Sequence, residues 1–443
     1  MGNGQSCNRM TSSDAMSDMK TPRPARHRPM RAAAAGSARL LLVTALATTT
    51  ALARMPQQPA TQSFHDAVAS AWARLPQRQD FAAQQGAASA RYTAGGAVFP
   101  NAPSLNGSYI NDKIAGSNYN YITTQIELST PIWLPGQGTA TQNTAQADNT
   151  AIAAASEAAH LALASEVLDL ATQAMLAANA RDVAIRRLAT ARVLASELAR
   201  RFRVGESSES DALAADADAA MASVTLTDAD TRLGLARAAL AVIVGTDMLP
   251  RLAVSGASTP VGMTAAALAR HPRIAAAERS LAAAQASARQ VRIENRDAPE
   301  IGVQGINEKQ PGSRWDTRFG VVLRLPFATD TRNAPRRAAA EQATTQAAVQ
   351  LALTRREVLA GVRQAEAVLA GAERGTVAAA RAASELERRR GQIDRAWRMG
   401  EMPLVEVVRA NAVAFDAGFA RDKALTELSA ARLRLQLAEG VLP

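Results

Sequence analysis

The stretch Phe202-Arg203-Val204-Gly205-Glu206 recurs 195 residues later as Trp397-Arg398-Met399-Gly400-Glu401. The same offset relates residues far from this stretch, and these pairs are Pro131 with Pro326, Asp211 with Glu406, and Gly245 with Gly440. A constant offset over so long a span indicates a duplication. Because the repeat is much longer than the roughly 20 to 50 residues of a solenoid unit, we expect two similar halves of one body, at residues 54–245 and 246–443.

Alanine dominates the apolar residues of the 443-residue chain, and only 4% of the residues are aromatic. This composition is typical of long, closely packed helices rather than of a compact core of large side chains. The formal net charge is +10, but residues 1–53 hold seven Lys or Arg against two Asp, a net of +5. The remaining charge is spread over a long chain, so we expect no nucleic-acid binding.

The N-terminal region up to Ala53 has the pattern of a secretory signal peptide. Basic residues precede an apolar run at residues 40–52, and the small residues Ala51 and Ala53 form the cleavage site. The residues before the basic region are atypically polar, so a start at Met19 or Met30 would give a more ordinary signal. The alternative is a membrane anchor, which the short and threonine-rich apolar run disfavours.

The residues that carry most metal and catalytic chemistry are scarce. The single cysteine, Cys7, lies in the expected signal, so we expect no disulfide, no thiol ligand and no lipid-bearing cysteine in the mature chain. His65, His160 and His271 are not paired at ligand spacing, which predicts neither a metal site nor a cofactor. The sequence shows no nucleophile and base pair and no phosphate-binding glycine loop, so we do not expect an enzyme.

Short segments that alternate polar and apolar residues occur as one pair in each half of the chain. This alternation, with turn-forming residues between the segments, predicts antiparallel strand pairs. The four expected strands are at residues 105–112, 121–129, 301–307 and 317–325.

Each strand pair leads into a long stretch of helix-forming sequence, at residues 139–203 and about 336–397. Large apolar residues recur there at spacings of seven and four, which indicates a helix with a coiled-coil seam. In the first stretch they are Leu161, Leu168, Met175, Leu194, Leu198 and Phe202. Each long helix is expected to turn back at a glycine, which gives two helical hairpins with tips at Gly205 and Gly400.

Glycines interrupt the second long helix. They are Gly361, Gly371, Gly375 and Gly391. Each glycine weakens a helix by about 1 kcal/mol relative to alanine, so we expect local unwinding or bending there.

Four strands cannot close a barrel by themselves, and in a bilayer an open sheet edge leaves backbone groups unsatisfied at a cost of several kcal/mol each. Closure therefore needs more than one chain. Two chains would supply eight strands, which enclose only side chains, whereas three would supply twelve and a water-filled lumen. The alternative is a periplasmic sheet with helical hairpins attached.

The duplicated order of helix, strand, strand and long helical hairpin resembles the TolC family of outer-membrane efflux ducts. The segments that enter the long helices carry this resemblance, at Pro131-Ile132-Trp133-Leu134-Pro135-Gly136 and Leu325-Pro326-Phe327, as do the tips from Phe202 to Asp211 and from Trp397 to Glu406. The resemblance covers nearly the whole chain after the signal. It implies a mainly α fold with β: a trimer whose chains give four strands each to a 12-stranded membrane β-barrel, and whose helices form an α-barrel tunnel.

The resemblance also implies a function. It is that of the outer-membrane channel of a tripartite, RND-type efflux system in a Gram-negative bacterium, a passive duct for small solutes or metal cations. Such a homotrimer contacts outer-membrane lipid and docks on a periplasmic membrane-fusion adaptor and an inner-membrane pump. Residues 295–300 and 324–336 resemble members encoded beside heavy-metal cation pumps. The alternatives are a type I secretion duct and a periplasmic coiled-coil scaffold without a pore.

By position, the resemblance implies a periplasmic gate at Ser210, Asp211, Glu406 and Arg409. Three copies would place six carboxylates near the mouth, where they attract cations. The alternative is that these carboxylates only complement helix N-termini. The family has a second acidic residue where this chain has Arg409, and a contact between Arg409 and Glu406 at i to i+3 would offset the charge of the carboxylate.

The hairpin tips are also the expected docking surface for the adaptor. The residues concerned are Phe202, Val204, Gly205, Glu206, Trp397, Met399, Gly400 and Glu401. The seam spacing of the two aromatic residues favours a core position for them over an adaptor seat. Tyr109, Tyr119, Tyr121 and Trp315 fit either an aromatic membrane girdle or ordinary strand packing.

Overall fold

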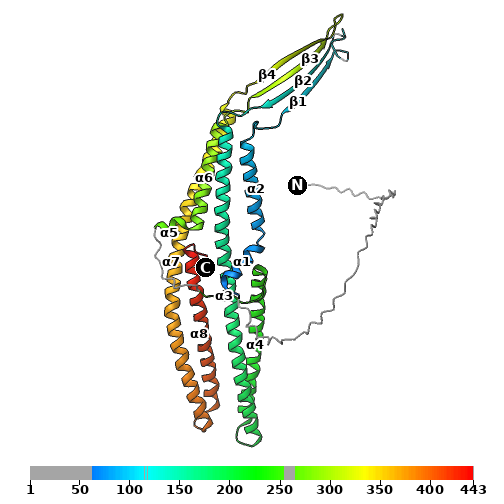
Figure 1. Ribbon diagram of the computed structural model, residues 1–443. Helices are drawn as coiled ribbons and strands as arrows, with labels where there is room; N and C mark the ends of the chain where they lie inside the picture. Colours follow the sequence, from blue (N-terminus) through cyan, green and yellow to red (C-terminus); the bar gives the residue numbers. More distant parts are fainter. Residues whose placement is uncertain (1–61, 114, 117, 254–264, 443) are drawn as a thin grey trace, which may run out of the picture. The chain divides into compact units, whose positions relative to one another are not determined.

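The computed structural model describes residues 62–113, 115–116, 118–253 and 265–442. The expected signal peptide, with its cleavage site at Ala51 and Ala53, lies outside these residues. Within the described part of the chain, the same order of elements occurs twice (Figure 1).

The first half runs helix, helix, strand, strand, long helix, returning helix. Its elements are α1 (Phe64–Arg74), α2 (Gln77–Gly95), β1 (Ser104–Asn111), β2 (Ile122–Pro131), α3 (Gln137–Arg203) and α4 (Glu209–Val244). The second half repeats this order with α5 (Ala265–Arg270), α6 (Pro272–Ile293), β3 (Glu300–Lys309), β4 (Asp316–Arg324), α7 (Asp330–Arg398) and α8 (Leu404–Ala438). The predicted fold class, a duplicated unit that is mainly helical with two strands in each half, is therefore confirmed.

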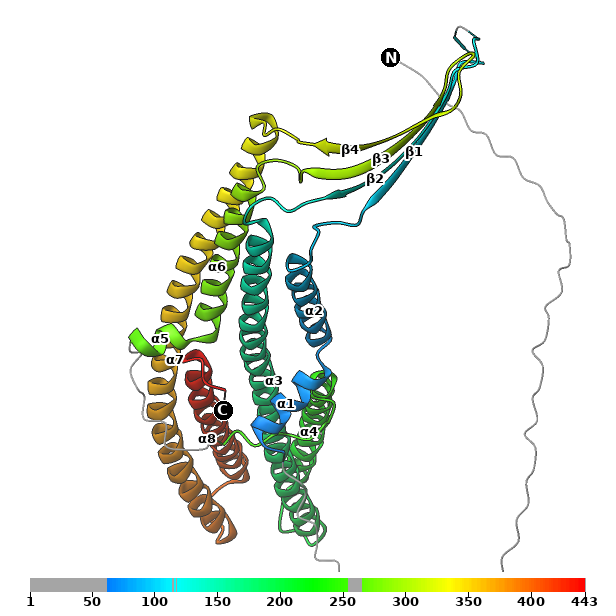
Figure 2. The same cartoon turned by 45° about the horizontal axis from the view of Figure 1, so that its top comes forward.

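The long helices α3 and α7 contain 67 and 69 residues. At a rise of 1.5 Å per residue, each is about 100 Å long. Two shorter helices follow one another along each of them, with α2 and α4 packed on α3 and α6 and α8 packed on α7 (Figure 2). Because α3 also contacts α6 and α8, it joins the two halves. The sheet lies at one end of the long helices and the hairpin reversals at the other.

The largest buried cluster lies midway along the long helices, where α1, α3, α4 and α8 meet. Its larger members include Phe64, Leu161, Val167, Leu168, Leu240, Val244, Leu433 and Leu437. Leu161 and Leu168, seven residues apart, are both buried, as the seam pattern predicts. Burial of each such side chain contributes about 1.5 to 3 kcal/mol, so this cluster holds both halves together.

The strands form one antiparallel sheet in the order β1-β2-β3-β4. Each predicted strand overlaps an observed one. The register pairs Leu105 with Leu128, Leu128 with Val303, and Val303 with Val321. Because side chains of directly paired residues lie on the same face, these four form one apolar row.

The opposite face of the sheet is mostly polar, although it also carries Ile110, Ile306 and Val322. The adjacent row runs through Asn106, Glu127, Gln304 and Gly320. The alternation continues along the strands, with Ile126 and Phe319 on the apolar face and Gln125 and Arg318 on the polar face. The sheet therefore has one apolar and one polar side, which is the pattern expected where two different solvents meet its two faces.

The start of α7 differs from the prediction. The helix begins at Asp330 rather than near Arg336, and Pro335 lies inside it. Two contacts with the segment after α6 hold the additional turn: Asn333 Nδ2 donates to the Asn295 carbonyl oxygen over 2.6 Å, and Arg336 Nη1 donates to that of Glu294 over 3.3 Å. Proline removes one helical hydrogen bond, and these tertiary bonds offset that loss.

The glycines of α7 do not interrupt it. The helix is continuous from Asp330 to Arg398, so the unwinding expected at these positions is not observed. Val358, Val362 and Ala365 are buried close to Gly361. Packing on neighbouring helices, rather than intrinsic propensity, provides most helical stability in proteins, and it outweighs about 1 kcal/mol per glycine.

Candidate functional site

The two hairpin reversals have the same backbone geometry. In the first, the amides of Gly205 and Glu206 donate to the carbonyl oxygens of Phe202 and Arg201, over 3.0 and 2.9 Å. In the second, Gly400 and Glu401 make the equivalent bonds over 2.9 Å each. Both glycines have φ near +80° (79° and 81°), where residues with a Cβ atom are strained. This pattern of two bonds is the Schellman motif, and it explains why a glycine ends the long helix in both repeats.

In the first hairpin, Asp211 occupies the first turn of α4. Its backbone N–H donates to Ser208 Oγ over 3.1 Å, so Ser208 is the helix cap. Ser210, which the family resemblance places beside Asp211, is exposed. The cap was not predicted, although Ser208 followed three residues later by Asp211 has the spacing of a capping box and could have indicated it.

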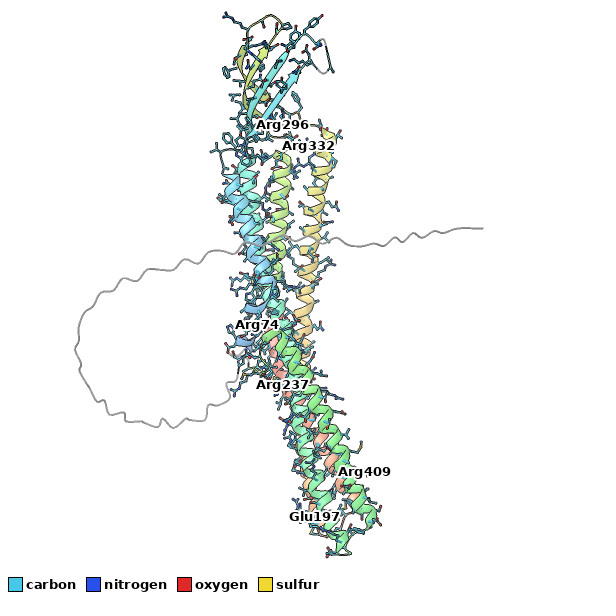
Figure 3. All side chains as sticks on the ribbon, turned by 90° about the vertical axis from the view of Figure 1, so that its right-hand side faces the viewer. Arg74, Glu197, Arg237, Arg296, Arg332 and Arg409 are labelled. Carbon is cyan, nitrogen blue, oxygen red and sulfur yellow. The ribbon has the colours of Figure 1, made fainter. Side chains whose placement is uncertain are left out.

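In the second hairpin, Glu406 occupies the first turn of α8 and is paired. Arg409 Nη1 lies 2.8 Å from Glu406 Oε1, which is the contact that the spacing predicts. Figure 3 shows Arg409 close to the reversal end of the helices. Both Asp211 and Glu406 therefore lie where a carboxylate interacts favourably with a helix N-terminus. Among the described residues, no hydrogen bond or ion pair joins the two carboxylates.

The equivalent aromatic residues of the two tips have different environments. Trp397 is only 7% exposed, as its seam spacing predicts, whereas Phe202 is 43% exposed in the single chain, contrary to that expectation. Val204 and Met399, two residues further on in each tip, are also exposed, as are Glu206 and Glu401. The tips therefore present apolar side chains to the surroundings from both hairpins.

Trp397 fills the space between the two hairpins near their tips. Its neighbours in the buried cluster come from both hairpins and include Leu194, Leu198, Ile393, Leu404 and Val407. The guanidinium of Arg201 lies over the indole ring, with Cζ 4.7 Å from the ring centroid. Arg201 Nη2 also pairs with Glu197 Oε1 at 2.7 Å. This cation–π contact, which was not predicted, links α3 to α7.

A hollow of about 660 Å³ lies on the first hairpin, between α3 and α4. Phe202 and Leu213 give it an apolar part, and Arg192, Glu209 and Asp216 line it with charge. The hollow continues from the exposed tip along the hairpin, so it is suited to receive a side chain or a short segment of a partner.

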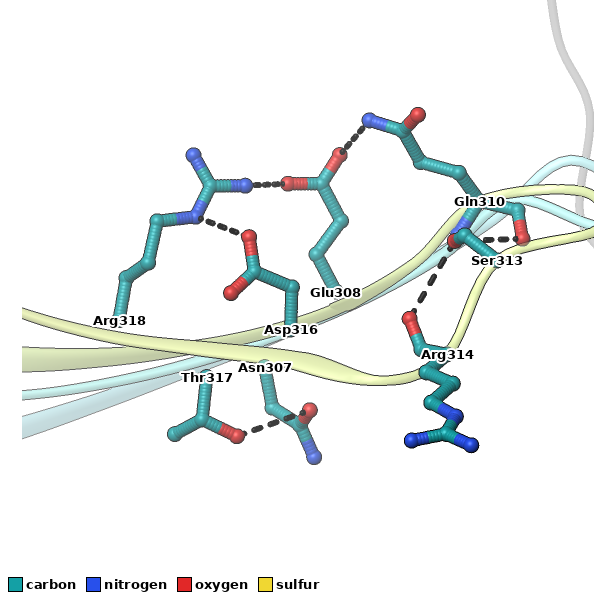
Figure 4. Close-up of polar contacts among 8 residues, drawn as sticks. All are labelled: Asn307, Glu308, Gln310, Ser313, Arg314, Asp316, Thr317 and Arg318. Atoms are coloured by element: carbon teal, nitrogen blue, oxygen red, sulfur yellow. Dashed lines mark hydrogen bonds and ion pairs between the residues drawn. The ribbon is translucent and has the colours of Figure 1, made fainter.

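Polar and charged side chains make hydrogen bonds and ion pairs at three places on the polar face of the sheet. Near its centre, Gln125 Nε2 donates to Gln304 Oε1 over 2.8 Å. At the end nearest the helices, Arg324 lies 3.2 Å from Glu300. Figure 4 shows the other end, where Arg318 contacts Glu308 and lies 3.1 Å from Asp316.

The polar face is the more shielded side of the sheet. Ser129 on this face is 3% exposed and Gly302 is buried, whereas Phe319 and Val321 on the apolar face are 88% and 74% exposed. The two faces of the sheet therefore differ in exposure as well as in polarity.

Two further observations concern the described residues alone. They contain no group of three or more His, Cys, Asp or Glu residues that could hold a metal ion. One helix, α3, is long and apolar enough to cross a membrane by length and composition alone, and 44% of its most apolar window is buried within the protein.

A duplicated unit of helices, two strands and a long helical hairpin, with both strand pairs in one curved sheet, defines the TolC-like fold. Comparison with solved structures supports this assignment: the chain is similar to the CmeC outer membrane channel of Campylobacter jejuni, with a TM-score of 0.69 and 15% identity over 91% of this chain and 94% of CmeC. Sequence comparison finds no matching family model and no matching curated protein.

Two other solved structures have the same fold. The outer membrane protein VceC of Vibrio cholerae matches with a TM-score of 0.65 and 16% identity, over 85% of this chain and 96% of VceC. The open state of the MtrE outer membrane channel of Neisseria gonorrhoeae matches with a TM-score of 0.67 and 19% identity, over 85% of this chain and 89% of MtrE. The fold is therefore shared over almost the full length of these proteins.

Proposed function

We propose that this protein is an outer-membrane channel of a Gram-negative bacterium, a passive homotrimeric duct in a tripartite efflux system. The observation that carries the proposal is the sheet, whose apolar face exposes large side chains such as Leu105, Val303 and Phe319. A contiguous apolar surface of this kind is unfavourable in water and favourable against lipid. The polar face then lines an aqueous lumen.

The edges of the sheet support assembly of several copies. Within the described residues, β1 and β4 each pair with one neighbour only, and the strands alternate in direction. The β4 strand of one copy can therefore pair antiparallel with β1 of the next. Three copies would supply twelve strands, enough for a water-filled lumen, and the observed lengths of 8 to 10 residues are close to the roughly 9 to 11 that a membrane strand needs.

In this proposal the helices extend from the membrane into the periplasm and form the tunnel. The hairpin tips, with exposed Phe202, Val204 and Met399 and the adjacent hollow, receive the periplasmic membrane-fusion adaptor. An inner-membrane pump of the RND type supplies the energy, and the transported substrates are small solutes or metal cations. The shared fold with CmeC, an outer membrane channel, supports this assignment of parts.

A direct test uses the purified mature protein and cell fractions. We expect the chain in the outer-membrane fraction, as a trimer that forms ion-conducting pores in planar lipid bilayers. A periplasmic monomer without pore activity would exclude the channel and favour a scaffold.

We also propose that Asp211 and Glu406 contribute to a gate at the periplasmic mouth. Removal of both carboxylates in the Asp211→Ala and Glu406→Ala double variant should raise single-channel conductance or lower cation selectivity, because six negative charges leave the proposed gate of the trimer. Glu206→Ala with Glu401→Ala is the matched control, since it removes as many tip carboxylates outside the helix first turns. If the currents of the first double variant equal those of the unmodified channel, these residues only cap helices.

A further inference from the structure

The polar face of the sheet carries a carboxylate that the proposals above do not use. Glu127 lies in the middle of β2 and is half-buried. Its paired neighbours are Asn106 on β1 and Gln304 on β3, and the row ends at Gly320 on β4. The row thus contains one charged residue, and its remaining positions are neutral.

The other acidic residues of this face have cationic partners. Glu300 pairs with Arg324, and Glu308 and Asp316 share Arg318. Among the described residues, no ion pair or hydrogen bond is found for the Glu127 carboxylate. Lys309, which follows Glu308 on β3, lies on the apolar face and approaches the ring of Trp315 rather than the lumen side.

The position of Glu127 gives its charge a consequence in an assembled pore. In the proposed trimer the polar face lines the lumen, so Glu127 would face the lumen at the central level of the sheet, and symmetric copies would repeat it at one height. Rings of acidic side chains favour cations and repel anions in channels. The other side chains of this row are the neutral amides Asn106 and Gln304, and Gln304 lies over the backbone of Gly320.

We propose that Glu127 forms a ring of three carboxylates that sets the cation preference of the membrane pore, separately from the charges at the hairpin tips. The inference rests on the proposed function as a trimeric channel. It names the class of ion that the lumen favours, which is small inorganic cations over anions of similar size.

The test is the reversal potential of the trimer in planar bilayers under a KCl gradient, with Glu127→Gln made in the Asp211→Ala and Glu406→Ala background so that the proposed gate carboxylates do not contribute. We expect the ratio of potassium to chloride permeability to fall severalfold, and Glu127→Asp to retain most of it. The control is the double variant Glu300→Gln with Arg324→Gln, which removes a neutral pair from the same face and should leave the ratio unchanged.

A second measurement introduces a charge at position 127 after the channel has assembled. Glu127→Cys in the mature chain provides one thiol, because the sole natural cysteine is Cys7 in the expected signal. A negatively charged thiol reagent should restore cation preference to the inserted channel, and a positively charged reagent should reverse it.

The outcomes separate the two proposals. A protein that inserts no pores contradicts the proposed function. If pores form and their ion preference is the same with Glu127, with Glu127→Gln and with either thiol adduct, the role of Glu127 is contradicted while the proposed function stands. An equal loss of cation preference in the neutral-pair control would also contradict that role.

Discussion

At the scale of single residues, the most informative comparison is between Trp397 and Phe202. They occupy equivalent positions in the two repeats and precede identical backbone reversals, but only Trp397 is buried. The difference comes from the partner hairpin, since Arg201 and the apolar residues of α3 cover the indole ring. The second repeat therefore contributes an anchor between the hairpins, and the first repeat contributes an exposed aromatic side chain.

Substitution of Trp397 by alanine should loosen the contact between the two hairpin tips. Replacement of a buried tryptophan costs about 3 to 5 kcal/mol, and here the loss of the cation–π contact adds to the lost packing. Hydrogen exchange at the ends of α3 and α7 should become faster. The matched variant Phe202→Ala should change exchange much less, and an effect as large as that of Trp397→Ala would show that the two positions are equivalent.

At the scale of elements, neighbouring residues of a strand should differ in how well they tolerate a charged substitution, because they lie on opposite faces of the sheet. Val303 and Gln304 are neighbours on β3, one on the apolar and one on the polar face. Arginine on a lipid-facing position costs about 2 to 4 kcal/mol at the centre of a bilayer, whereas a lumen position is hydrated.

Val303→Arg should therefore reduce the amount of folded trimer in the outer membrane, and Gln304→Arg should leave it near the unmodified level. The folded fraction can be read from trimer migration on gels without heating. Equal yields of the two variants would contradict the assignment of the faces.

Most of the helices and strands could be predicted from the sequence, because alternation in the strands and the seam spacing in the helices are local patterns. The additional turn of α7 could not be predicted: Pro335 argues against it locally, and the stabilising contact between Asn333 and Asn295 joins residues 38 positions apart. The different burial of Phe202 and Trp397 could not be predicted for the same reason: the two residues have the same local spacing, but their neighbours come from distant parts of the sequence. The contact of Arg409 with Glu406 was predictable because both residues lie on one helix turn.

At the scale of the whole molecule, the unpaired edges of β1 and β4 determine how copies can meet. Neighbouring strands lie about 4.7 to 4.9 Å apart, which is within the range of Cα separations that disulfides bridge. Cysteine pairs can therefore test the arrangement of the chains.

A chain with Ser108→Cys on β1 and a second cysteine at position 318 or 320 on β4, which share the polar face with Ser108, should form disulfide-linked dimers and trimers under mild oxidation. The reason is that β4 of one copy pairs with β1 of the next in a closed barrel. Gel electrophoresis without reductant would show the linked species. Chains with only one of the two cysteines are the control, and linkage between identical β1 positions would indicate a different, two-fold contact.

The buried Trp397 also has a consequence for symmetry. Three copies would place six hairpins around the mouth and create six seams between them. Three of these seams lie within a chain and are closed by Trp397 and Arg201, whereas the other three form only when chains assemble. The mouth would then open as three rigid pairs of hairpins that separate at alternate seams. The open mouth would therefore have threefold rather than sixfold symmetry.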